Sequence, residues 1–273
     1  FEVKSNVDEV HAKYPKVQGS LIAKGVIESP LSKKAPVRTE LHGKIDHFPT
    51  FIIDSTLKTF GIDIYPSMLL GSEITASLSS KLEDLSGYFD LDIASPQANL
   101  NFNAFLNDGV LKLTKPIKGN LEMTENLSEA LLKNMGISLA QASSPISLFI
   151  SDKGFYLPVH PFKFENIQVR YGSLDLKKLI CYNKGSPSDV GEIFRLSNNS
   201  SKQIHLWFAP SEFSISNGFL NVDRTEVLFD RAYQIAFWGS VNMAKRYVNM
   251  TLGLTEQALR DTLGIRGLPK AFV

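Results

Sequence analysis

The sequence is poor in cysteine, and this limits how the chain can be stabilised. Cys181 is the only cysteine among 273 residues, so no disulfide can form within the chain. A chain of this length does not need one, because it can bury a sizeable hydrophobic core. No histidine and asparagine or aspartate pattern typical of a thiol nucleophile accompanies Cys181. We therefore interpret it as a small buried hydrophobic residue.

An excess of one charge and a long apolar run are also lacking. The 29 lysines and arginines nearly balance the 28 aspartates and glutamates. No basic stripe with interleaved aromatic residues occurs, so we expect no nucleic-acid partner. No apolar run reaches the ~20 residues that a membrane-spanning helix needs. The chain starts at Phe1 without a signal peptide and stops within the apolar motif 268–273, so we interpret it as a fragment of a longer protein whose membrane anchor lies elsewhere.

The common catalytic and cofactor motifs are missing as well. There is no phosphate-cradling glycine-rich loop, no zinc-binding histidine pair with a glutamate and no nucleophile elbow. His42 and His47 are five residues apart, which on a regular strand places them on opposite faces, so a shared metal is disfavoured. We predict no enzymatic activity, no metal site and no cofactor.

Two polar stripes are the best candidates for a chemical site in this sequence. Asp90 and Asp92 share one face of a predicted strand and could in principle flank a sugar or a cation. Asn99, Asn101 and Asn103 form a second stripe on the next strand. We favour a solvated polar face for both stripes, because alternating strands normally turn such residues to water.

What the sequence does contain is period-two alternation from end to end, which is typical of half-buried antiparallel strands. Within 37–46, Leu41 and Ile45 alternate with Glu40 and Lys44. Three tight hairpins are predicted, at Asn107-Asp108-Gly109, at Asp152-Lys153-Gly154 and at Asn217-Gly218. Hydrophobic residues make up 43% of the chain, which is ordinary for a folded protein and too many for a disordered one.

Two or three short helices interrupt the predicted strands. Thr124 and Thr255 are candidate N-caps for helices that end at Gly136 and Gly264. The segment 51–60 is ambiguous and could be the third helix. No clear linker divides the chain, so we expect a single elongated β domain over 1–273, with 136–144 as the best candidate boundary.

The predicted strands carry more apolar surface than two or three short helices can cover. Two solutions remain open: the sheet closes on itself as a barrel or sandwich, or it curls into a groove that holds an apolar guest. Each acyl methylene that moves from water onto an apolar wall gains about 0.8 kcal/mol. A groove could therefore hold a lipid without any specific polar chemistry.

The last third of the chain carries a recognisable run of short motifs. They are His205-Leu-Trp-Phe-Ala-Pro210, Phe213-Ser-Ile-Ser-Asn-Gly218, Asp223-Arg224, Ile235-Ala-Phe-Trp-Gly239, Val241-Asn-Met243, Val248-Asn-Met250 and the stretch from Leu259 to Leu268. This run resembles the C-terminal portion of AsmA-like bacterial envelope proteins of the TamB type, a bridge-like lipid-transfer group. The resemblance covers about 145–273 and extends to the strand end Tyr171-Gly-Ser-Leu-Asp-Leu176.

The resemblance implies a mainly β fold whose antiparallel strands curl into an elongated, β-taco-like groove. It also implies a periplasmic protein, tethered to the inner membrane in its full-length form, that binds or transfers phospholipid or another acyl-chain lipid. No catalytic residues come with it. The residues expected to line the groove are Phe89, Leu91, Ile93, Leu100, Phe102, Phe213, Ile215, Ile235 and Phe237.

Two alternatives stay open at this stage. The first is a structural or adhesive β-sandwich that binds a protein partner and holds no lipid. The second is a carbohydrate-active enzyme that uses the face of Asp90 and Asp92.

Overall fold

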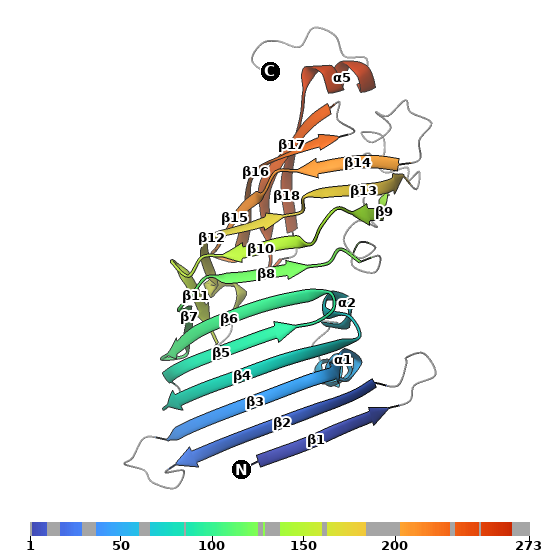
Figure 1. Ribbon diagram of the computed structural model, residues 1–273. Helices are drawn as coiled ribbons and strands as arrows, with labels where there is room; N and C mark the ends of the chain where they lie inside the picture. Colours follow the sequence, from blue (N-terminus) through green and yellow to red (C-terminus); the bar gives the residue numbers. More distant parts are fainter. Residues whose placement is uncertain are drawn as a thin grey trace. The chain divides into compact units, whose positions relative to one another are not determined.

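The protein is mainly β, with its strands in one large antiparallel sheet (Figure 1). The computed structural model describes residues 2–9, 17–28, 37–59, 66–84, 86–124, 128, 137–159, 163–183, 203–229, 233–245 and 247–263. Within these residues eighteen strands belong to the sheet. The predicted class, an antiparallel β protein with a few short helices, is confirmed.

The strands of the first half follow the predicted alternation closely. They are β1 (Glu2–Glu9), β2 (Val17–Glu28), β3 (Arg38–Pro49), β4 (Glu73–Glu83), β5 (Ser86–Ala94), β6 (Ala98–Asn107), β7 (Val110–Leu113), β8 (Ile117–Leu121) and β9 (Ile137–Ala142). The remaining strands are β10 (Ile146–Ile150), β11 (Phe155–Pro158), β12 (Gln168–Asp175), β13 (Lys178–Asn183), β14 (Gln203–Phe208), β15 (Ser211–Ser216), β16 (Phe219–Phe229), β17 (Tyr233–Asn242) and β18 (Tyr247–Leu254).

The helices are short and lie at strand ends. In the described residues they are α1 (Thr50–Thr59), α2 (Pro66–Leu70), α5 (Glu256–Leu263) and the 3-10 turn η2 (Phe164–Asn166). The ambiguous segment 51–60 is thus largely helical, and the helix after Thr255 is confirmed. The Ala258 N–H donates to Thr255 Oγ1 at 3.3 Å, the bond expected of an N-cap. None of the helices in the described ranges is long and apolar enough to cross a membrane.

The helix predicted after Thr124 lies almost wholly outside the described residues. Ser128 is described and is helical, and its N–H donates to the Thr124 carbonyl at 2.9 Å. The rest of that prediction, up to Gly136, stays a prediction.

The chain divides into two compact units. The first comprises Phe1–Leu121 and Leu148–Tyr171, and the second comprises Glu122–Ser147 and Gly172–Val273. The segment 136–144, the boundary suggested by the sequence, lies inside the second unit. Each unit is therefore built from segments that are distant in the sequence.

In the first unit, β1 to β6 follow one another as neighbouring antiparallel strands (Figure 1). Helices α1 and α2 lie where β3 ends and β4 begins. The Thr50 N–H donates to the Ser72 carbonyl at 3.0 Å, and the Ser67 N–H donates to Asp54 at 3.1 Å. These bonds hold both helices at one end of the strands. The helices therefore do not run along the sheet.

The hairpins predicted at 107–109 and 217–218 are present with the expected turn geometry, whereas the strand after the turn at 152–154, β11, has its register with β12 and β7. Asn107 opposes Val110, and the two turn residues Asp108 and Gly109 have φ angles of 49° and 74°. The turn at 217–218 has φ angles of 52° and 78°. Positive φ at both central positions defines a type I′ turn, which matches the twist of the flanking strands.

Each unit has a buried core of its own. In the first unit Ala104 of β6, Leu113 of β7 and Ile117 of β8 form one buried cluster. In the second unit Leu179, Leu206 and Phe229 are 1%, 4% and 1% exposed, respectively.

Candidate functional site

The expected lining residues of the first unit share one face of the sheet. The register pairs Leu91 with Phe102 and Ile93 with Leu100. Directly opposed residues on antiparallel strands point to the same side, and residues two apart on a strand also do so. Phe89 therefore lies on this face as well, and the five residues form one continuous patch.

The patch continues across the neighbouring strands. Leu91 opposes Leu78, Leu78 opposes Gly43, and Gly43 opposes Ala23, so one row of small and apolar residues crosses β5, β4, β3 and β2. We call the whole surface the apolar face of the first unit. Its members are Ala23, Leu41, Gly43, Ile45, Leu78, Leu82, Phe89, Leu91, Ile93, Leu100 and Phe102.

The cover of this face is uneven, because Ser80, between Leu41 and Phe89, is 5% exposed and the best covered apolar residues lie at its borders. Ile74 and Ala76, near α1 and α2, are 4% and 8% exposed, and Ala104 in the buried cluster of β6 to β8 is 1% exposed. Between these borders Leu78 and Leu91 are only half-buried, as are all the other members of the apolar face. Side chains enclosed on all sides in a core are buried far more completely. The described residues therefore cover most side chains of the apolar face only in part.

The opposite face of the same strands is mostly polar, and several of its side chains hydrogen-bond to one another. The Asn101 amide donates to the Asp92 carboxylate, and the Asn103 amide donates to the Asp90 carboxylate. His42 contacts Ser79 at 3.2 Å on the same face. The two aspartates suggested as a carbohydrate site are thus each engaged by an amide of the next strand.

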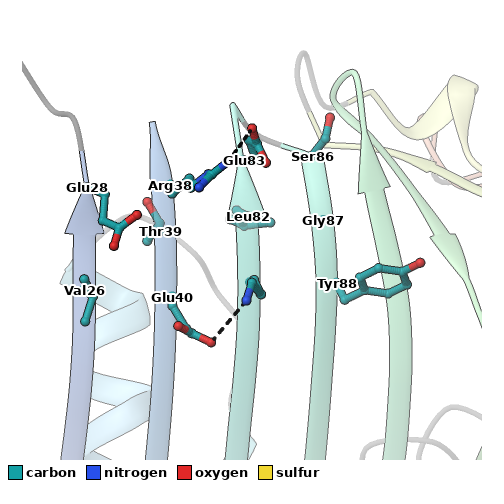
Figure 2. A pocket seen from close by; sticks show the side chains of 11 residues that line it. Val26, Glu28, Arg38, Thr39, Glu40, Leu82, Glu83, Ser86, Gly87 and Tyr88 are labelled. Carbon is teal, nitrogen blue, oxygen red and sulfur yellow. Dashed lines mark ion pairs between the residues drawn. The ribbon is translucent and has the colours of Figure 1, made fainter. Parts of the chain in front are cut away.

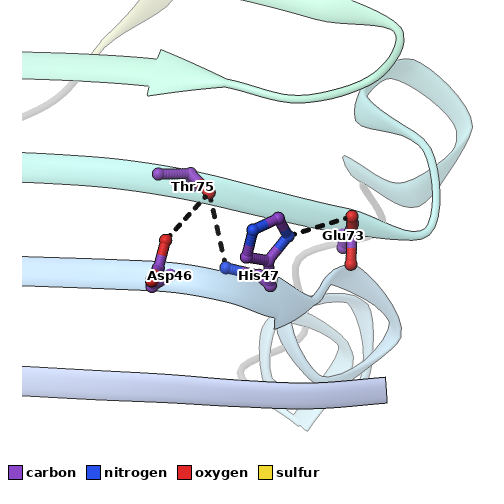
Figure 3. A network of polar contacts seen from close by, with 4 residues as sticks. All are labelled: Asp46, His47, Glu73 and Thr75. Atoms are coloured by element: carbon purple, nitrogen blue, oxygen red, sulfur yellow. Dashed lines mark hydrogen bonds and ion pairs between the residues drawn. The ribbon is translucent and has the colours of Figure 1, made fainter. Parts of the chain in front are cut away.

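A bulge in β3 changes the face of one candidate histidine. The register shifts between Ile45 and Phe48, and His47 has a φ of 46°. Figure 3 shows its ring beside Glu73, with His47 Nδ1 3.1 Å from Glu73 Oε1. Since Glu73 lies on the polar face, the argument from simple alternation that separated His42 and His47 does not hold. An extra residue turns the second histidine to the polar side.

These two histidines nevertheless have separate partners. His42 Nε2 lies 3.9 Å from Glu40 Oε1, whereas His47 pairs with Glu73. Thr75 joins the second group, because it accepts from the His47 N–H at 3.4 Å and donates to Asp46 at 3.5 Å (Figure 3). In the described part of the chain no cluster of histidine, cysteine, aspartate and glutamate could hold a metal ion.

A surface hollow of about 500 Å³ lies at one end of β2 to β5 (Figure 2). Two ion pairs border it, Arg38 with Glu83 at 3.6 Å and Lys81 with Glu40 at 3.8 Å. All four side chains are largely exposed, so these pairs contribute little to stability. By the register these four side chains and Tyr88 point to the polar face, opposite Leu82, so the hollow belongs mainly to the polar face.

The lining residues of the second unit also share one face. Phe213 opposes Val222, and Val222 opposes Gly239 on β17. Ile235 and Phe237 have the same parity as Gly239 on that strand, so they lie on the same side, and Ile215 follows Phe213 by two. Ile235 is 7% exposed, and the other three lining residues are half-buried. We call this surface the apolar face of the second unit.

Phe213 is held there by a glycine. A Cβ atom on Gly172 would lie 2.3 Å from the Phe213 ring, so only glycine allows the ring to lie against the β12 backbone. The sequence analysis includes Gly172 in the strand end 171–176 but predicts no packing role for it, because that role depends on Phe213, which lies 41 residues further along the chain.

Cys181 is fully buried in the second unit, as the sequence suggested. Burial raises the pKa of its thiol to about 11. Thiolates are the reactive form, so this thiol is inert in the folded protein.

We therefore expect Ellman's reagent to modify Cys181 at pH 8 at least ~100-fold faster in urea than in the folded protein. The free energy of unfolding should also fall as pH rises from about 9 to about 11, because the unfolded thiol loses its proton there and the folded one does not. Cys181→Ala should remove that part of the pH dependence. Equal rates of modification in buffer and in urea would contradict the burial.

The comparisons with known proteins identify no relative. No family model matches the chain, and no curated protein or solved structure matches it. The resemblance to AsmA-like proteins therefore remains a prediction from the motifs.

Proposed function

We propose that this chain binds acyl-chain lipids, phospholipids among them, on the apolar faces of its sheet and that it catalyses no reaction. The observation that carries the proposal is the apolar face of the first unit. Eleven small or apolar positions lie on one side of β2 to β6, half-buried, while the three helices of the described residues lie at strand ends. At about 0.8 kcal/mol for each buried methylene, a single acyl chain on this surface would gain enough to stay bound.

The proposal also includes a curled groove and a cellular location. A sheet that curls around its apolar side would shelter a lipid from water, as the resemblance to AsmA-like envelope proteins implies. On the same ground we propose a periplasmic location, with attachment to the inner membrane through parts outside this chain.

The test compares two glutamate variants of one strand. Leu91→Glu puts a charge in the middle of the apolar face, whereas Tyr88→Glu puts it on the opposite side of β5, where Tyr88 is 59% exposed. Native mass spectrometry of the purified protein should show bound lipid in the wild type and in Tyr88→Glu, and at least ~5-fold less in Leu91→Glu, because burying a charge beside an acyl chain is costly.

Two results would count against the proposal. One is a wild-type protein that is free of lipid and binds no fluorescent fatty acid. The other is equal loss of lipid in both variants. A structural or adhesive β-sandwich predicts the first result, together with a thermal stability that added lipid does not change.

A further inference from the structure

The outermost strand of the second unit, β18, has an unprotected edge. In the described part of the chain, the strand register pairs β18 with β17 alone. The N–H and C=O groups on the far side of such a strand form a template for another strand. Natural proteins usually guard these edges with charged residues or proline, yet Tyr247–Leu254 contains neither.

The side chains of β18 are also unusually apolar and exposed. Tyr247, Val248, Met250 and Leu252 are 63%, 59%, 38% and 44% exposed. Val248, Met250 and Leu252 alternate along the strand and oppose Val241, Gly239 and Phe237 of β17. They therefore extend the apolar face of the second unit to its outer edge, where nothing among the described residues covers them.

We propose that β18 pairs with β18 of a second copy of this chain, in antiparallel orientation, to form a symmetric dimer. A two-fold axis perpendicular to the sheet keeps the apolar sides of both copies on the same side. With Met250 opposite Met250, Val248 of each copy opposes Leu252 of the other, so the exposed stripe covers itself. Isologous pairs of this kind are the commonest oligomers.

The charges at the ends of β18 favour this orientation. Lys245 precedes the strand, and Glu256, which also pairs with Arg260 at 2.6 Å, follows it. Antiparallel pairing brings the Lys245 end of each copy beside the Glu256 end of the other, twice by symmetry. Complementary charges of this kind favour one register and orientation over others.

The other edge strand fits β18 less well. Four of the eight residues of β1 are charged, namely Glu2, Lys4, Asp8 and Glu9. Pairing β18 with β1 of another copy would join unlike edges and would therefore build open chains of molecules. The sequences of β1 and β18 therefore favour a closed dimer through β18 over pairing of β18 with β1.

The first test measures the mass of the full chain by light scattering over a range of concentrations. We expect a dimer in the wild type and in the control Tyr88→Lys, which adds a charge to an exposed position of an interior strand. Val248→Lys should weaken dimerisation at least ~10-fold, because it places a lysine in the middle of the new contact.

A second test does not depend on how well the lysine variant folds. Met250→Cys should form a disulfide between copies under mild oxidation, since opposed Cβ atoms of paired strands lie close enough for one. Cys181 does not interfere, because it is buried. Tyr88→Cys should cross-link far more slowly. A wild-type monomer at all concentrations, open-ended oligomers, or equal cross-linking of both cysteine variants would overturn the proposal.

Discussion

Replacing Phe229 with alanine should destabilise the second unit by about 3–5 kcal/mol, the usual cost of truncating a buried phenylalanine. Phe229 is 1% exposed and opposes Leu206 on β14 and Tyr233 on β17. Its ring therefore fills space at the point where three strands meet. The surrounding side chains cannot close the resulting cavity without moving those strands, so most of the lost contact energy would not be recovered.

The matched control lies on the same strand. Phe219, at the other end of β16, is 39% exposed, and Phe219→Ala should cost less than ~1.5 kcal/mol. Urea denaturation followed by circular dichroism gives both values.

The rate at which the Cys181 thiol is modified gives an independent measure of opening in the same unit. If Phe229→Ala lowers the free energy of opening by the expected amount, modification of the buried thiol should become ~100-fold faster or more. Equal midpoints for the two phenylalanine variants, or an unchanged rate at Cys181, would show that Phe229 does not support the core.

Alternation along the sequence was enough to predict the two faces of each strand. Phe89, Leu91 and Ile93 were separated from Asp90 and Asp92 by parity alone, and the register confirms that separation. The reason is physical: in a regular strand the side-chain direction depends only on position, not on which strand lies beside it.

Features that depend on the partner strand were not predictable in the same way. The bulge at His47 adds one residue to β3 and turns the histidine toward Glu73. A second register shift lies between Val222 and Thr225 of β16. Nothing in a single strand marks such a shift, because it is defined by a mismatch between two strands. Parity arguments along a bulged strand, such as the one made for His42 and His47, therefore fail.

The pairing of distant segments could not be predicted from the sequence either. β11 pairs with β7, where Leu157 opposes Leu111, and β13 pairs with β9. Both contacts join strands separated by many residues, and short apolar strands carry little information about which partner they choose. The division into two discontinuous units follows from these contacts, so it could not be read from composition or linkers.

A single methyl group added at Gly87 should destabilise the first unit by roughly 2–4 kcal/mol, the cost of a strained backbone plus a steric clash. Gly87 has a φ of 153°, a conformation that other residues rarely adopt. A Cβ atom there would lie 1.9 Å from the Lys81 carbonyl oxygen and 2.9 Å from Leu82 Cα. Since both contacts are with the backbone of β4, relief requires β4 and β5 to separate at the border of the hollow.

Gly43 offers the same chemical change without the strain. It lies on the apolar face of the same unit, and a Cβ atom there would meet only Leu78 Cβ, at the ordinary distance of 3.7 Å. Gly43→Ala should therefore leave the stability nearly unchanged or raise it by about 0.4–1 kcal/mol, because alanine restricts the unfolded chain. Thermal and urea unfolding of the two variants measure the difference. If both alanines shift the unfolding midpoint equally, the close approach of β4 to β5 at Gly87 is wrong, and the hollow beside it has a different border.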